Sequence, residues 1–438
     1  MSKDFNRREF MGVAGLAATG LAIGLAGCGK NRTFELKPFL DQAPDGKELK
    51  AGLIGCGGRG TGAAINFLDA GPNLKIHALG DLFKDRVDGC KTKLKNEKNV
   101  EVADENCFTG FDAYEKVIDS GVDIIILATP PHFRPMQFAA AIDARKHVFM
   151  EKPVAVDPVG ARSIMASSKK AEKLGLVVGT GTQRRHQRDY VTAFKQIYEG
   201  AIGEVVSANC YWNQSQLWYR EPKKNLSEME NMIRDWVNWT WLSGDHIVEQ
   251  HVHNIDVIHW FSEAKPVKAV GFGSRQRRVT GDQYDNFSVD FEYDNGMHMH
   301  SMSRQINGCA NNVSEFIKGS KGYSNCQNKI WNDKGEVIWE YKYAKTDDEY
   351  WAANNLKVSP YVQEHIDLVT AIRNNKPYVE AEQTAISTMA AIMGRISAYT
   401  GKEVTWEEMM NSNIKLGPNE YLLGKVDVIK SVKVPGVE

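Results

Sequence analysis

Ala51-Gly52-Leu53-Ile54-Gly55-Cys56-Gly57-Gly58-Arg59-Gly60 is the stretch of this 438-residue chain that decides its fold. The apolar pair at its centre predicts a strand that leads into the glycine loop, and residues 61–69 predict a helix directly after the loop. Asp81 ends the next predicted strand, about 20 residues further on. Glycines at this spacing, between a strand and a helix and followed by an acid, are the fingerprint of a dinucleotide-binding turn.

Each glycine of the loop has a physical role. Gly55 permits the tight turn, Gly57 lets a pyrophosphate approach the backbone N–H groups at the helix start, and Gly60 lets helix and strand pack closely. The same site is expected to include the remaining loop residues Cys56, Gly58 and Arg59.

The acid after the second strand bears on the choice of nucleotide. Asp81 would accept hydrogen bonds from the adenosine ribose hydroxyls and would repel a 2′-phosphate. NAD is therefore favoured over NADP, and the nearby cations Arg59 and Lys84 are the argument for NADP.

Short apolar runs and helical stretches alternate from the glycine loop to about residue 181. The run Ile124 to Ala128 lacks polar alternation, as a strand buried on both faces should. This alternation predicts an α/β fold in which residues 47–181 form a doubly wound parallel sheet, the Rossmann type. Strands are expected at residues 53–54, 74–79, 124–128, 147–150 and 176–179, and helices at 61–69, 136–144 and 158–174.

The pattern changes beyond Gln183 to longer strand-like segments. Residues 288–293 alternate polar and apolar side chains with a period of two, which favours an antiparallel sheet with one covered face. Residues 182–438 are therefore predicted to form a second domain. Strands are expected at 205–212, 267–273, 286–293 and 297–303, and helices at 248–261, 361–373 and 382–400.

Two further motifs follow predicted strands. Thr129-Pro130 comes after the buried strand, and Glu151-Lys152-Pro153 comes after the next one. The carboxyl ends of parallel strands lie at one edge of the sheet, where such sheets bind ligands, so Thr129, Pro130, Glu151 and Lys152 are expected to contact the nucleotide. A lysine here can be an ordinary solvated residue, but its place between Glu151 and Pro153 at a strand end favours an active-site role.

In combination these motifs resemble the Gfo/Idh/MocA family of oxidoreductases, which includes glucose-fructose oxidoreductase and inositol dehydrogenase. The resemblance covers the glycine loop, Thr129-Pro130, Glu151-Lys152-Pro153 and the stretch Gly244 to Trp260. Members of this family pair a Rossmann domain with an α/β domain whose open, mostly antiparallel sheet holds the substrate and often builds oligomers. The resemblance thus implies a homo-oligomer.

The resemblance also implies three catalytic residues. Lys152 matches the family lysine that contacts the nicotinamide ribose and the substrate hydroxyl, His253 the acid/base histidine, and Glu249 an aspartate four residues earlier. On one helix that spacing puts both side chains on the same face. Neutral His253 would accept the hydroxyl proton, Lys152 would stabilise the developing alkoxide, and Glu249 would orient the imidazole. The alternatives are a histidine bonded to the backbone and a solvated carboxylate.

The sequence departs from the family pattern at two positions near the nicotinamide. Pro131 stands where asparagine is common, and Arg134 stands where histidine is often found, so the hydrogen bonding there is expected to differ. His246, Glu249 and His253 have a spacing that could suggest a metal site. We expect no metal, because the family needs none and no second ligand cluster is visible.

Several polar residues are candidates for substrate contact. The segment at residues 183–186 follows the last parallel strand and either faces the cleft or forms a basic surface loop. The candidates are Arg184, Arg185, His186, Tyr190 and His251.

The N-terminal segment predicts export. Asn6-Arg7-Arg8-Glu9-Phe10 places a twin arginine ahead of the uncharged run Val13 to Ala26, which is shorter than the roughly 20 residues of a membrane-spanning helix. Leu25-Ala26-Gly27-Cys28 has the form of a lipobox, although Cys28 can also be a small residue near a cleavage site. We expect residues 1–28 to be a twin-arginine signal, Cys28 to carry a lipid, and residues 29–46 to form a flexible linker. The expected location is the periplasm or cell envelope, with membrane contact only through the lipid.

Composition excludes other classes. Lys plus Arg number 54 and Asp plus Glu number 55, with no basic block that could follow a phosphate backbone, so nucleic acid is not an expected partner. The 7 cysteines include no Cys-x-x-Cys pair, which argues against a zinc site or a disulfide framework.

These observations favour an exported oxidoreductase that keeps its NAD and transfers hydride to or from a sugar, glycoside or polyol. The second hypothesis is a glycosidase or lyase that acts through a transient keto-sugar, with His186, Tyr190 or His251 as an additional base. The third is a non-catalytic, nucleotide-dependent sugar sensor, against which Lys152 and His253 argue. The sequence does not separate the first two.

Overall fold

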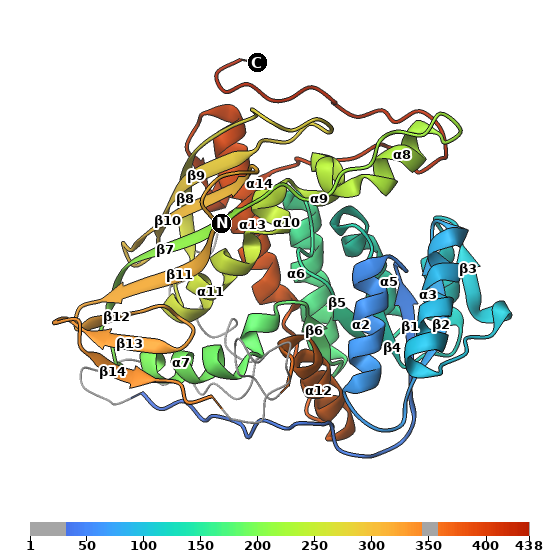
Figure 1. Ribbon diagram of the computed structural model, residues 1–438, viewed down its shortest axis with the longest axis horizontal. Helices are drawn as coiled ribbons and strands as arrows, with labels where there is room; N and C mark the ends of the chain where they lie inside the picture. Colours follow the sequence, from blue (N-terminus) through green and yellow to red (C-terminus); the bar gives the residue numbers. More distant parts are fainter. Residues whose placement is uncertain (1–31, 344–357, 438) are drawn as a thin grey trace, which may run out of the picture.

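The computed structural model describes residues 32–343 and 358–437, which form two α/β units side by side (Figure 1). The predicted signal segment and Cys28 lie outside these residues. No helix within the two described ranges combines the length and the apolarity that a bilayer crossing requires.

The first unit is built on a six-stranded parallel sheet in the order β3-β2-β1-β4-β5-β6. The predicted doubly wound sheet is therefore confirmed. The strand order reverses between β1 and β4, so the glycine loop after β1 lies at the switch point where such sheets bind nucleotides. The strands are β1 (Leu49–Ile54), β2 (Leu74–Asp81), β3 (Cys107–Thr109), β4 (Ile124–Leu127), β5 (His147–Met150) and β6 (Val178–Thr180). The helices are α2 (Gly58–Asp69), α3 (Lys84–Lys98), α4 (Ala113–Asp119), α5 (Arg134–Asp143) and α6 (Pro158–Lys173), with short 3-10 turns η1 (Asp104–Asn106) and η2 (Pro131–Phe133).

The second unit contains a nine-stranded sheet in the order β14-β13-β12-β11-β7-β10-β9-β8-β15. Only β7 and β10 pair in parallel, so the expected open, mostly antiparallel sheet is confirmed. Helices α11 and α13 cover one face, and no described helix covers the other (Figure 1). The strands are β7 (Val205–Gln214), β8 (Pro266–Ser274), β9 (Asn286–Tyr293), β10 (His298–Gln305), β11 (Asn312–Gly319), β12 (Gly322–Ser324), β13 (Lys329–Asn332), β14 (Val337–Glu340) and β15 (Val404–Thr405). The helices and turns are η3 (Gln183–Arg185), α7 (Arg188–Tyr198), α8 (Glu228–Arg234), η4 (Trp236–Asn238), α9 (Thr240–Ser243), α10 (His246–Glu249), α11 (Val252–Ser262), α12 (Pro360–Arg373), α13 (Ala381–Thr400) and α14 (Trp406–Asn411).

Helix α12 lies near the end of the chain but packs on the first unit, against α2 and β6. Its residues Ile366, Leu368 and Val369 are fully buried in the same hydrophobic cluster as Phe67 of α2. Val379, just after this helix, forms a β-bridge with Val178 of β6. The nucleotide-binding unit is therefore made from two separate stretches of chain.

Residues 32–46, the described part of the predicted flexible linker, lie against both units. The Phe34 ring contacts the Phe194 ring edge-on, with 5.2 Å between centroids. Arg188 donates a hydrogen bond of 2.9 Å to the Asp41 carboxylate, and Ala43 is buried with its N–H bonded to the Ala70 carbonyl. The polar composition that predicted a flexible tether gives no sign of these few anchoring side chains.

The C-terminal tail, residues 412–437, is extended and crosses from the second unit to the region of α8 (Figure 1). The Leu416 N–H donates to Asp157 at 2.7 Å, and the Val426 N–H donates to Glu228 at 2.8 Å. These bonds fasten the tail to both units.

Candidate active site

The glycine loop has the geometry of a phosphate-binding turn. Gly55 has a φ of +98°, and a Cβ there would lie 2.6 Å from the Ala128 backbone. A Cβ on Gly60 would lie 1.8 Å from the Gly55 carbonyl oxygen, so the close approach of helix and strand needs glycine. Gly57 and Gly58 have open space beyond their Cα atoms, and α2 begins at Gly58 with no side-chain cap. The N–H groups at this helix start are thus available to an anion.

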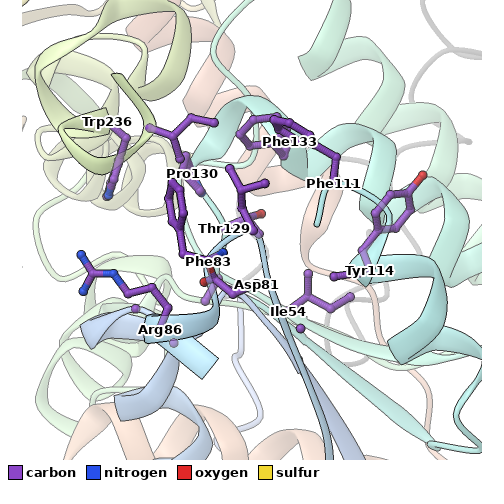
Figure 2. A pocket seen from close by; sticks show the side chains of 18 of the residues that line it. Ile54, Asp81, Phe83, Arg86, Phe111, Tyr114, Thr129, Pro130, Phe133 and Trp236 are labelled. Carbon is purple, nitrogen blue, oxygen red and sulfur yellow. The ribbon is translucent and has the colours of Figure 1, made fainter. Parts of the chain in front are cut away.

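A cavity of about 410 Å³ extends from this loop past Asp81 (Figure 2). The Asp81 carboxylate accepts hydrogen bonds from the N–H groups of Cys56 at 2.8 Å and Phe83 at 2.9 Å. It therefore sits at the cavity edge with further lone pairs for ribose hydroxyls. Thr129 and Pro130, predicted to bind the nucleotide, also line the cavity. Open glycines at a helix start and an acid at the end of β2 fit a bound NAD.

The two cations that argued for NADP have other partners. Arg59 pairs with Glu151 at 2.5 Å and lies 4.8 Å from the ring centre of Tyr361, while Lys84 pairs with Asp88 at 2.7 Å on the surface. Sequence reasoning missed three other cations that line the cavity, Arg86, Arg220 and Arg234, of which Arg86 lies near Asp81 (Figure 2). The place of Arg86 in the first turns of α3 was the available signal.

Two alanine substitutions should separate the roles of the loop glycines. Gly57→Ala should leave the thermal stability of nucleotide-free protein unchanged, because its Cβ meets open space. It should weaken NAD binding about tenfold or more, since it obstructs hydrogen bonds to a charged group. Gly60→Ala should lower the free energy of unfolding by about 1–3 kcal/mol or more through overpacking. Thermal unfolding and titration calorimetry measure the two effects, and equal behaviour of the two variants would contradict these roles.

Lys152 and Glu249 meet between the two units. The Lys152 ammonium donates a hydrogen bond to the Glu249 backbone carbonyl, and its Nζ lies 3.4 Å from Glu249 Oε1. Both side chains are about nine-tenths buried. Glu249 therefore holds the lysine at the ends of the parallel strands, next to β5, and its other carboxylate oxygen accepts a hydrogen bond from Gln250. The predicted contact of Glu249 with the His253 imidazole is replaced by these two partners.

The segment that carries Glu249 and His253 is not one continuous helix, so that expectation was wrong. Helix α10 ends at Glu249 and α11 begins at Val252, and the His253 N–H bonds to the Gln250 carbonyl. In a continuous helix the His253 N–H would bond to the Glu249 carbonyl. The break leaves that carbonyl for Lys152, an arrangement that periodicity cannot reveal.

His253 is 8% exposed and stacks on Trp212, with 5.8 Å between ring centroids and 22° between planes. Burial, together with the positive charges of Lys152, Arg184 and Arg59, lowers the pKa of His253 well below 6.5. The imidazole is therefore neutral at pH 7 and able to accept a proton.

Arg134, which replaces the family histidine, joins the two strand-end motifs. Its guanidinium donates to the carbonyls of Thr129 at 2.9 Å, Glu151 at 2.9 Å and Pro153 at 2.5 Å, and the residue is 4% exposed. The loops after β4 and β5 are thus held in a fixed relation, with Lys152 between two of the bonded carbonyls.

Arg134→Met should lower the free energy of unfolding by about 2–5 kcal/mol, because the carbonyls of Glu151 and Pro153 lose the charged donor that Arg134 supplies. Arg145→Met is the matched control, since Arg145 is exposed at the end of the same helix and should change stability little. Urea denaturation compares the two. Equal stability of both variants would show that the Arg134 hydrogen bonds contribute nothing to the free energy of unfolding.

Two of the predicted substrate residues come together near His253. Arg184 forms an ion pair with Glu315, and the Tyr190 hydroxyl donates to the same carboxylate at 3.0 Å. The Arg184 guanidinium lies 5.9 Å from the ring centre of Trp212, the ring on which His253 stacks. Sequence reasoning missed Glu315, because it lies in β11, a strand that was not predicted, and a single acid there belongs to no motif.

The other three predicted substrate residues lie elsewhere. Arg185 binds Asp256 through two hydrogen bonds. His186 sits between Asp367 and Glu380, and although burial opposes the charged form, these carboxylates raise its pKa well above 6.5. His251 is buried against Ser301, and burial lowers its pKa to about 3. These placements are typical of residues that hold the fold together.

Metal ligation was also tested by the geometry. Across residues 32–343 and 358–437, no three His, Cys, Asp or Glu side chains are grouped as a metal site requires. His246, one of the three with suggestive spacing, instead pairs with Asp245 and Ser303.

Comparison with known families matches both units. Residues 49–181 match the model described as the oxidoreductase family with an NAD-binding Rossmann fold. Residues 190–324 match the Gfo/Idh/MocA C-terminal domain. The first unit is therefore an NAD-binding Rossmann domain.

Individual relatives are more distant. The inositol 2-dehydrogenase/D-chiro-inositol 3-dehydrogenase of Halalkalibacterium halodurans is 25% identical over 217 residues, which are 50% of this chain and 48% of that relative. The chain thus aligns with about half the length of that protein.

Solved structures show the same fold. Scyllo-inositol dehydrogenase from Lactobacillus casei, with bound NAD(H) and scyllo-inositol, has a TM-score of 0.60 at 20% identity and matches 82% of this chain and 99% of its own. Aldose-aldose oxidoreductase from Caulobacter crescentus, complexed with glycerol, has a TM-score of 0.62 at 17% identity, with the same shares covered.

Proposed function

The chain belongs to the Gfo/Idh/MocA family of oxidoreductases, and on that premise we propose that it transfers hydride between a tightly held NAD and a sugar, glycoside or polyol. The observation that supports the proposal is the contact between Lys152 and Glu249 at the end of β5, with the neutral imidazole of His253 near enough for the charges of Lys152 and the loop residue Arg59 to lower its pKa. The names of the relatives, which act on inositols and aldoses, support a polyhydroxylated substrate.

Each residue has a part in the proposed reaction. NAD, when bound, accepts the hydride from a substrate carbon. His253 accepts the hydroxyl proton as the C–H bond breaks, which its lowered pKa permits. Lys152 stabilises the negative charge that develops on the oxygen, and Glu249 fixes the direction of the ammonium. Trp212 offers an aromatic face beside His253, suited to the C–H surface of a sugar.

The placement of the candidate extra bases favours this function over glycoside elimination. Tyr190 donates its hydroxyl proton to Glu315, and His186 and His251 are buried in other parts of the fold. A second base beside His253 would be needed to remove the proton next to a keto group. The Tyr190 hydroxyl, which lies near His253, and the imidazoles of His186 and His251 are already engaged by Glu315, Asp367 and Ser301, which supports hydride transfer as the first choice.

The test is to denature the purified mature protein, identify the released nucleotide by absorbance and mass, and repeat after incubation with sugars, polyols and aryl glycosides. We expect bound NAD that becomes NADH with one class of carbohydrate. Release of aglycone without net NADH would favour the glycosidase instead. Protein that neither contains nor binds NAD would refute the proposal.

We also propose that the open face of the large sheet joins copies of this chain. Phe272, Met302 and Tyr211 lie in one row across β8, β10 and β7, with Ser288 of β9 between Phe272 and Met302, and Phe272 is 73% exposed. An exposed apolar row of this kind is typical of an interface. Phe272→Glu should shift the mass measured by light scattering toward the monomer, and Val279→Glu, exposed outside the sheet, is the control.

We propose export by the twin-arginine route and lipidation of Cys28, on the sequence pattern alone. Labelling of the expressed protein with a radioactive fatty acid should mark the native chain and not the Cys28→Ala variant. Equal labelling of both would refute the lipid anchor.

A further inference from the structure

Part of the wall of the nucleotide cavity comes from outside the Rossmann unit. Trp218 and Trp236 flank helix α8 of the second unit, and Tyr421 belongs to the C-terminal tail, yet all three line the cavity. Figure 2 shows Trp236 across the cavity from Phe111 and Phe133 of the Rossmann unit. We call residues 218–236 together with Tyr421 the clasp.

The clasp is fastened to the Rossmann unit by its own hydrophobic cluster. Met229 and Ile233 of α8 pack with Phe83 and Phe133, in a cluster separate from the core of either unit. This cluster connects α8 to the start of α3 and to the turn after β4. The clasp can move away from the Rossmann unit only when the packing of this cluster is disrupted.

An ion pair also joins α8 to α3. Arg234 donates two hydrogen bonds to the Asp85 carboxylate, at 2.7 and 3.0 Å, and its guanidinium lies 3.9 Å from the ring centre of Phe83. The Arg234 guanidinium beside Asp85 holds the pKa of that carboxyl below its usual range. The bidentate geometry fixes the angle between α8 and α3.

The tail supplies the second half of the clasp. Tyr421 lies between Phe111 and Phe133, with ring centroids 5.9 and 5.4 Å away, and its hydroxyl is 2.8 Å from His132 Nε2. The tail is bonded to α8 through the Met229 N–H and the Gly424 carbonyl, at 3.0 Å. Both covering elements are therefore connected to each other.

We propose that the clasp covers the adenosine half of the bound dinucleotide and slows its release. The inference rests on the proposed function, because it requires NAD in this cavity. The glycine loop takes the pyrophosphate and Asp81 takes the ribose, so the base enters the part of the cavity beyond Asp81. Aromatic rings there stack on a base, and release requires the clasp to open. NAD is thereby held as a resident group through repeated turnovers.

The experiment measures release of NADH by fluorescence after full-length protein loaded with NADH is mixed with excess NAD. Trp236→Ala removes one wall, and Asp85→Asn breaks the ion pair with Arg234 at an exposed residue outside the cavity. The matched control is Asp88→Asn, which removes an exposed acid from the same helix. We expect release to accelerate about tenfold or more for Trp236→Ala. We expect about threefold or more for Asp85→Asn, and no change for Asp88→Asn.

The outcomes distinguish this inference from the proposed function. Release from Trp236→Ala within about twofold of the wild-type rate would overturn the clasp and leave hydride transfer untouched. If both variants release NADH faster, but none of the carbohydrates tested reduces the NAD bound to the wild-type protein, the clasp is supported and the proposed function is refuted. Wild-type protein that binds no dinucleotide would overturn both.

Discussion

Lys152→Met is expected to lower the rate of hydride transfer by about 10²–10⁴-fold while the protein keeps its NAD. The ammonium supplies the positive charge at the oxygen that loses its proton, and methionine has similar length but no charge. The nucleotide should remain because the glycine loop and Asp81 are unchanged. Single-turnover reduction of the bound NAD, followed at 340 nm, measures the step directly.

The control for this variant is Lys170→Met, which removes an exposed lysine that pairs with Asp143. It should react at the wild-type rate. A Lys152→Met protein that reacts within about tenfold of wild type would remove the lysine from the chemistry. If the wild-type protein binds a sugar but catalyses no reaction with it, the hypothesis of a non-catalytic sugar sensor is favoured.

His253→Asn is expected to cause the second large loss, also about 10²–10⁴-fold, because no group then accepts the hydroxyl proton. Asparagine keeps a polar side chain against Trp212, so the fold should be retained. Trp260→Phe, at a half-buried aromatic packed on Phe194, is a control for disturbance of the same helix.

The pH dependence gives this prediction a second readout. The proton acceptor is the neutral imidazole, and the pKa of His253 is lowered well below 6.5 by burial and nearby cations. The wild-type rate should therefore stay level as the pH falls from 8 to about 6.5 and decline only below that range. In His253→Asn the acid decline should disappear. A wild-type rate that already halves near pH 7 would contradict a depressed pKa.

The Rossmann domain could be predicted because its signals are local. The run at 124–128 corresponds to β4, and the strand at 147–150 has the predicted bounds. The fingerprint also predicted that Asp81 lies beside the glycine loop, where its carboxylate accepts a hydrogen bond from the Cys56 N–H. Patterns of this kind depend on residues close in sequence, where periodicity and turn chemistry determine structure.

The contacts that shape the site could not be predicted in the same way. Arg134 was seen as a departure from the family, but its three carbonyl partners depend on two loops that meet only in the folded chain. The break between α10 and α11 leaves the Glu249 carbonyl free to accept a hydrogen bond from Lys152, 97 residues away. Glu315 is one of several charged residues buried by tertiary pairing. Each depends on distances that a linear pattern does not contain.

The return of α12 to the Rossmann sheet has a consequence for protein engineering. A fragment that ends at residue 181 would lack the helix that covers Phe67, and would leave that part of its core in water. Such a fragment is expected to aggregate when expressed alone. An exchange of nucleotide-binding modules between relatives must therefore transfer residues 358–380 together with the sheet, as two pieces from distant parts of the gene.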